Sequence, residues 1–187
     1  MRISNLHRSN TVLLAAGLIG LLTLSACSTA PSSSEAKSDL RHSSADALAQ
    51  AESNDPSLRD IIRKSSGYAV FPTIGKGAIG IGGAYGKGDV YQHGAVVGYC
   101  DMSQASIGFQ LGGQSYSELL VFETPLAVEN FKNGNFSFDA QATAVALKSG
   151  AGANAKFVNG VAVFTMDEAG LMYEASVGGQ KFSYQAR

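Results

Sequence analysis

Between residue 67 and the C-terminus, several runs alternate apolar and polar residues one by one, and glycines stand inside these runs. In one such run Ile107, Phe109 and Leu111 alternate with Ser106, Gly108, Gln110 and Gly112. A period of two places successive side chains on opposite faces of a strand, so this pattern predicts half-buried antiparallel strands. Glycine accounts for 22 of the 187 residues, and glycines within strands mark strong twist and close backbone approach. We therefore predict a curled antiparallel sheet, either a sandwich or a partly open barrel.

Three helices are predicted around this sheet. Residues 39–66 have a helical pattern, and the Asp-Pro pair at 55–56 supplies a cap and a first-turn proline that divide it into two helices. Thr124, directly before a proline, caps a third helix near 124–132, inserted between strands. The expected fold class is mainly β, or α+β, with two N-terminal helices and a β-rich part over 67–187.

The N-terminus has the pattern of an export signal. Two arginines and an apolar run over 12–24 precede the small residues Ser25 and Ala26, and Cys27 follows them. The apolar run is shorter than the roughly 20 residues that a membrane-spanning helix needs. The pattern therefore favours a signal peptide over 1–26 that is removed, rather than a transmembrane anchor.

The sequence Leu-Ser-Ala-Cys at 24–27 resembles the bacterial lipobox, whose cysteine carries diacylglycerol and an N-linked acyl chain such as palmitate. The resemblance implies that Cys27 is the lipidation site and the first residue of the mature lipoprotein. Two or more acyl chains hold a protein stably in a membrane. Ser28, rather than aspartate, follows the cysteine, which in enterobacterial rules implies the outer membrane. We expect a lipid-anchored protein of the bacterial cell envelope, on the outer membrane facing the periplasm, with residues 27–38 as a flexible tether before a domain over 39–187.

The charge balance and the number and positions of the reactive residues exclude several functions. With 14 lysines and arginines against 15 acidic residues, the chain has no basic footprint for nucleic acid. Of the three histidines, His7 lies in the signal, His42 lies near the tether, and His93 alone falls in the β-rich part, so a two-histidine metal site is excluded. Cys100 stands in an apolar run and is predicted to be buried and inert. Because no acids are paired at catalytic spacing, we expect no catalysis, no metal and no cofactor.

Two short motifs partly match signatures of specific chemistry. Residues 75–80 match G-x-G-x-x-G, but the residues after them form helices poorly, whereas a dinucleotide site needs a helix N-terminus there. Residues 113–117 lack the final glycine of a nucleophile elbow. A twisted, glycine-bearing hairpin is the better interpretation of the first motif, and the second gives no support to a serine hydrolase.

Five cations form the candidate binding site. Arg59, Arg63 and Lys64 fall within one and a half turns of the second predicted helix, and Lys76 and Lys87 flank the glycine-rich hairpin. A lysine or arginine near an anionic membrane contributes about 1 kcal/mol, so phosphate head groups suit such a cluster. The alternative is an ordinary solvated helix face, because acidic residues dilute the charge around it.

Several stretches of the chain resemble the SYLF domain, a lipid-binding module of bacteria and eukaryotes. In chain order they are Gly-Tyr-Ala-Val-Phe-Pro at 67–72, the glycine-rich 75–88, Glu-Leu-Leu-Val-Phe at 118–122 with Ala127 and Phe131, Gly-Asn-Phe at 134–136, and the hairpin around 163–171. The resemblance implies binding of phosphoinositides or other anionic phospholipids through a basic, amphipathic N-terminal segment, without catalysis. Here that segment is 58–64, which contains Arg59, Arg63 and Lys64. Some eukaryotic members also bind and bundle actin, but no actin is expected as a partner in a bacterial periplasm.

The sequence thus predicts a non-catalytic, membrane-anchored lipoprotein whose partner is a phospholipid membrane and whose domain binds anionic lipid head groups. The alternative from a different class is a structural cell-envelope protein that acts through a protein or peptidoglycan partner.

Overall fold

A curled, mainly antiparallel sheet dominates the computed structural model, which describes residues 28–79, 81–107, 114–134, 136, 145–146, 148–167 and 179–187. The helices in these ranges are α1 (Ser34–Asn54), α2 (Leu58–Lys64) and α3 (Pro125–Lys132). The strands are β1 (Gly67–Ile79), β2 (Ile81–Gln92), β3 (Ala95–Ile107), β4 (Gln114–Phe122), β5 (Val145–Ala146), β6 (Val161–Asp167) and β7 (Gln180–Ala186).

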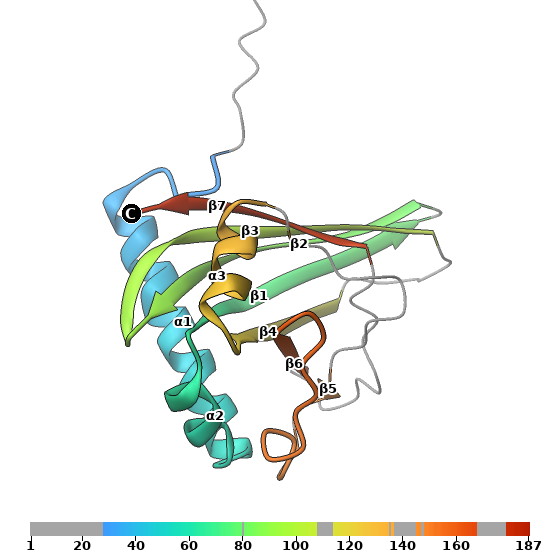
Figure 1. Ribbon diagram of the computed structural model, residues 1–187. Helices are drawn as coiled ribbons and strands as arrows, with labels where there is room; N and C mark the ends of the chain where they lie inside the picture. Colours follow the sequence, from blue (N-terminus) through green and yellow to red (C-terminus); the bar gives the residue numbers. More distant parts are fainter. Residues whose placement is uncertain are drawn as a thin grey trace, which may run out of the picture.

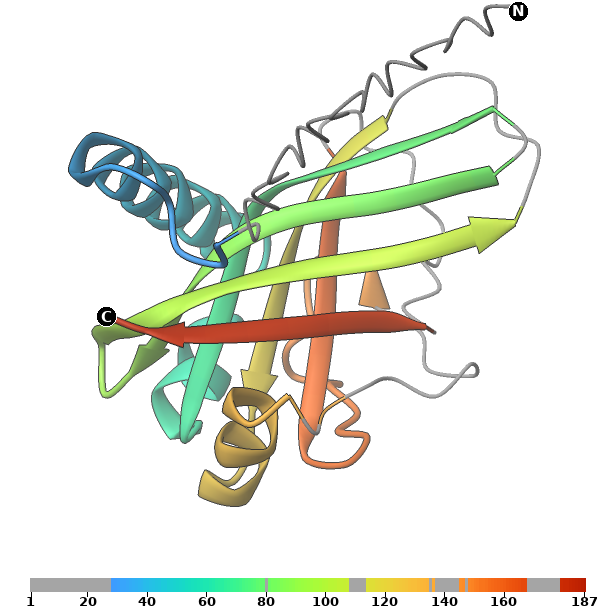
Figure 2. The same ribbon diagram turned by 90° about the horizontal axis from the view of Figure 1, so that it is seen from above.

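The strands follow the order β5-β6-β4-β1-β2-β3-β7, and every neighbouring pair is antiparallel except β5 and β6. The sheet curls but does not close into a barrel, and α1 and α3 lie on its opposite sides (Figures 1 and 2). The predicted fold class, including the two N-terminal helices and the helix inserted near 124–132, is confirmed. Of the two predicted architectures, the single open sheet corresponds to the partly open barrel.

Each face of the sheet has its own apolar core, whereas the alternating pattern predicts strands that are buried on one face only. On the α3 side, Phe71, Phe122 and Phe131 are completely buried. On the α1 and α2 side, Leu58 and Phe164 are buried. Burying both faces explains why the alternating runs carry so many apolar residues for their length.

A glycine inside β3 shows why the strands need this residue. A Cβ atom at Gly98 would overlap the ring of Tyr184 and the carbonyl of Gln185 on the neighbouring strand β7. Here the glycine allows a side chain of β7 to lie directly over the backbone of β3.

The structure starts α1 at Ser34, within the range 27–38 that the sequence predicts as a tether. The hydroxyl of Ser33 accepts a hydrogen bond from the amide of Ala36 at 3.0 Å, which caps the helix. The serine-rich stretch therefore supplies a helix cap as well as a connection. Residues 1–26 and Cys27 lie outside the described residues. No helix of the described ranges is long and apolar enough to cross a membrane.

Candidate functional site

Asp55 fixes the α2 end of the molecule. Its side chain is 1% exposed and its carboxylate accepts four hydrogen bonds. The donors are the Ser57 amide at 3.1 Å, the Ser57 hydroxyl at 2.7 Å, the Gly150 amide at 3.1 Å and the Gly152 amide at 2.6 Å. Burial raises the pKa of the Asp55 carboxyl, but the hydrogen bonds from Gly152, Ser57 and Gly150 together lower it below its ordinary value. Asp55 thereby holds the loop of residues 148–157 against the start of α2.

The three predicted cations of α2 are close together and exposed. Arg59 donates to Glu52 at 3.1 Å, Arg63 donates to Asp60 at 2.7 Å, and Lys64 ends the helix. The arginine side chains are 63% and 71% exposed, and exposed ion pairs contribute about 0–1 kcal/mol. These pairs are therefore weak enough to open when a stronger anion approaches.

Two further cations belong to this end of the molecule and were missed by the sequence analysis. Lys148 and Lys156 are exposed on the loop that Asp55 holds against α2, and Ala153 of this loop donates to the Ser57 hydroxyl at 2.9 Å. The five residues Arg59, Arg63, Lys64, Lys148 and Lys156 are called the basic end below. The only sequence signals were an aspartate and two glycines more than 90 positions apart, which no local pattern connects.

A cavity of about 280 Å³ lies beside Arg63. Its walls come from the end of α2, the start of β1 and the β2–β3 turn, and its lining residues are Ile62, Arg63, Ser65, Gly67, Tyr68, His93 and Gly94. His93 and Gly94 have φ values of 51° and 76°, the left-handed pair of a tight hairpin turn, which presents the imidazole at the surface. A guanidinium and an imidazole beside this cavity can donate hydrogen bonds to a phosphate group.

The structure does not bring Lys76 and Lys87 to this end. In the β1–β2 register Lys76 lies opposite Ala84, which belongs to the core on the α3 side. Lys87 lies opposite Thr73, three positions further along, so the two lysines are on opposite faces of the sheet. The ammonium of Lys87 contacts backbone carbonyls of residues 28–30 and is therefore already partnered.

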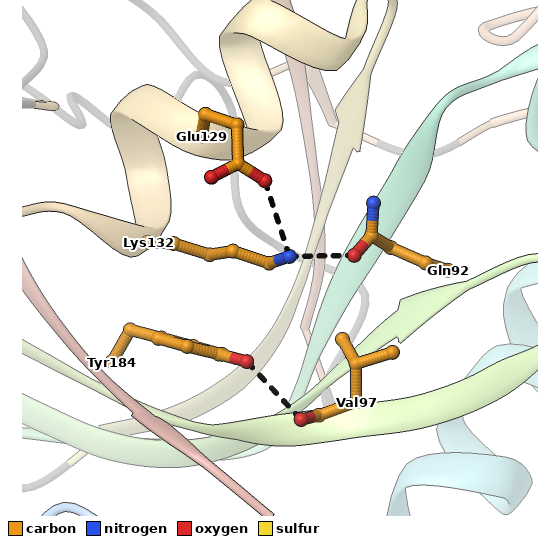
Figure 3. Close-up of polar contacts among 5 residues, drawn as sticks. All are labelled: Gln92, Val97, Glu129, Lys132 and Tyr184. Atoms are coloured by element: carbon orange, nitrogen blue, oxygen red, sulfur yellow. Dashed lines mark hydrogen bonds and ion pairs between the residues drawn. The ribbon is translucent and has the colours of Figure 1, made fainter.

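Lys132 of α3 also makes its contacts within the domain. Figure 3 shows its ammonium donating to Gln92 of β2 at 2.6 Å and to Glu129 at 3.3 Å. The same ammonium lies 5.9 Å from the centre of the Tyr184 ring, and the Tyr184 hydroxyl donates to the Val97 carbonyl at 3.1 Å. With its side chain only 19% exposed, Lys132 joins α3 to the sheet and is not available to a ligand.

The reactive side chains of the described residues do not converge. Cys100 is completely buried, as predicted, and burial raises the pKa of its thiol, with the charges of Asp89 and Glu118 adding to the effect. His93 lies in an exposed turn. Within the described part of the chain, no group of three or more histidine, cysteine or acidic residues could hold a metal ion.

Comparison with known proteins gives two matches. Residues 103–186 match the Ysc84 family model, described as a Las17-binding protein actin regulator, which represents the SYLF domain. "Beta cell expansion factor A" of Aeromonas veronii is 27% identical over 137 residues, which are 73% of this chain and 52% of that protein. The chain thus spans about half the length of this curated relative.

Proposed function

We propose that the domain of this chain, whose residues 103–186 match the Ysc84 (SYLF) family model, binds anionic phospholipid head groups at a membrane surface. The family includes lipid-binding modules, and among the described residues the basic end has the chemistry for that ligand. The proposed role is binding without catalysis, and no cofactor is needed for it.

The observation that supports the proposal best is the convergence of five exposed cations from two separate segments on one end of the molecule. Glu52 and Asp60 are the acidic partners of Arg59 and Arg63, so the basic end keeps a positive balance. At about 1 kcal/mol for each cation near an anionic surface, five cations give useful affinity even after partial neutralisation. The cavity beside Arg63 would admit one head-group phosphate, with His93 as a second donor.

We propose further that Cys27 carries the lipid that anchors the mature protein, so that the domain acts in the bacterial cell envelope, on the periplasmic side of the outer membrane. The lipobox at 24–27 supports this anchor.

Co-sedimentation with vesicles tests head-group binding. The protein without residues 1–27 retains every described element, so it isolates the domain from the anchor. We expect it to sediment with vesicles that contain phosphatidylglycerol, not with pure phosphatidylcholine vesicles, and to be released by high salt, because salt screens exposed charges. If the protein sediments with neither kind of vesicle, the proposal is wrong and a structural role with a protein or peptidoglycan partner becomes the better explanation.

A further inference from the structure

Residues 28–30, which directly follow the proposed lipidated cysteine, are bound to the sheet and are called the strap. The Lys87 ammonium donates to the carbonyls of Ser28 at 2.5 Å and Thr29 at 3.1 Å, and it lies 3.5 Å from that of Ala30. The Gln185 side-chain oxygen accepts from the Ser28 hydroxyl and the Ala30 amide, both at 3.1 Å.

The strap is thus part of the folded body. Lys87 belongs to β2 and Gln185 to β7, the two strands on either side of β3, so the strap crosses β3. Ala30 is only 5% exposed. An ammonium that is bound by several carbonyls holds the backbone firmly. We therefore expect the lipid anchor to leave the domain beside the strap, over β3, rather than at the end of a flexible tether.

The strap and the basic end lie at opposite ends of α1. This helix has 21 residues, so at 1.5 Å per residue it is about 30 Å long. Figure 1 shows the chain entering α1 at one end of the molecule and α2 at the other. The Debye length is about 8 Å at physiological ionic strength, so over about 30 Å a screened potential falls to roughly 2% of its value.

The outer face of α1 opposes an arrangement in which the molecule lies flat on an anionic membrane. The exposed charged residues of this helix are all acidic: Glu35, Asp39 and Asp46. Its two basic residues are half-buried against the sheet, and the Lys37 ammonium lies 5.3 Å from the centre of the Tyr99 ring. Lying flat would bring three carboxylates against lipid phosphates, which repel them.

We infer that the anchored protein presents its basic end to a second anionic membrane, opposite the membrane that holds its lipid. This inference rests on the proposed anchor and on the proposed head-group binding. The strap fixes the anchored end, acidic α1 acts as a spacer, and the basic end meets the second surface. The protein is then a bridge between two membranes.

Vesicle bridging tests the inference. Mature lipoprotein that carries a fatty-acid label is inserted into phosphatidylcholine vesicles and mixed with acceptor vesicles containing phosphatidylglycerol. We expect clusters, measured by dynamic light scattering, that do not form with phosphatidylcholine acceptors and that disperse in high salt. Arg63→Glu with Lys64→Glu should reduce the clustered fraction by at least about tenfold, whereas Lys181→Glu with Arg187→Glu, the matched reversal on β7 and at the residue after it, should not.

A second measurement reports the orientation directly. Fluorophores are placed at Lys64→Cys or at Ser183→Cys, and buried Cys100 stays unlabelled. Spin-labelled head groups in the anchoring vesicle should quench the probe at position 183, close to the strap, and leave the probe at position 64 bright. Lys87→Met, which releases the strap, should bring the two intensities closer together, and Lys181→Met should not.

The outcomes distinguish a failure of the membrane bridge from a failure of head-group binding. Equal quenching of the two probes, or no clusters although the protein without residues 1–27 binds anionic vesicles, would overturn the bridge and leave head-group binding intact. Failure of that shorter protein to bind would overturn both. Absence of the fatty-acid label would remove the anchor, and the bridge with it.

Discussion

Replacing Asp55 by alanine is expected to lower the free energy of unfolding by about 2–4 kcal/mol. The carboxylate accepts hydrogen bonds from Ser57, Gly150 and Gly152, and its removal leaves three backbone amides and a hydroxyl without this partner. Urea denaturation followed by circular dichroism measures the change. Asp46→Ala, at an exposed position of α1, is the matched control and should change stability by no more than about 0.5 kcal/mol.

The effect of Asp55 should also depend on pH. Because its pKa is lower in the folded protein than the ordinary 3.8, its contribution is present above pH 3.8 and is lost as the pH falls through the folded value. The difference in the free energy of unfolding between wild type and Asp55→Asn should therefore decrease as the pH falls below 3.8. An effect of Asp55→Ala no larger than that of Asp46→Ala would show that the 148–157 loop is held by other contacts.

Replacing Glu118 by glutamine is expected to stabilise the protein at pH 8 by about 3 kcal/mol and to leave it unchanged at pH 4. Glu118 is completely buried on β4, and one of its oxygens accepts from the Gln180 amide at 3.0 Å while the other has no hydrogen-bond partner. Burial raises the pKa of the Glu118 carboxyl from 4.5 to about 7, and the hydrogen bond from Gln180 offsets only part of this.

The sign of the pH effect follows from the direction of the shift. Between pH 4.5 and about 7 the folded protein keeps a proton that the unfolded chain has released, so stability falls as the pH rises through this window. Glutamine is neutral throughout and its amide can donate to the free oxygen of Gln180. Thermal melts from pH 4 to pH 8 compare the stability of wild type and Glu118→Gln. Glu123→Gln, at an exposed position, is the control. A Glu118→Gln protein that keeps the wild-type pH dependence would show that another group causes it.

The sheet could be predicted from the sequence because alternation is a local signal. The glycines of 75–88 and the alternating runs beside them indicate curled antiparallel strands without knowledge of their partners. Thr124 and the Asp-Pro pair at 55–56 likewise mark helix starts by local hydrogen bonding, and helices begin at or near them. Strand order and register depend on long-range contacts, and no local pattern fixed them.

Register is also the reason why the candidate site was predicted only in part. The spacing of Arg59, Arg63 and Lys64 on one short helix could be seen in the sequence. A hairpin between Lys76 and Lys87 could be seen as well, but a shift of one residue exchanges the two faces of a strand. The actual register separates these lysines, while Asp55 adds Lys148 and Lys156 from a distant loop.

The central claim is that the basic end binds anionic lipid, and matched charge reversals test it most directly. Three double variants of the protein without residues 1–27 carry the same change in charge: Arg63→Glu with Lys64→Glu, Lys148→Glu with Lys156→Glu, and Lys181→Glu with Arg187→Glu. After circular dichroism confirms folding, their affinity for vesicles containing phosphatidylglycerol is measured by co-sedimentation. We expect the first two to weaken binding by at least about tenfold and the third to bind like wild type. Equal binding by all three variants and wild type would contradict the claim.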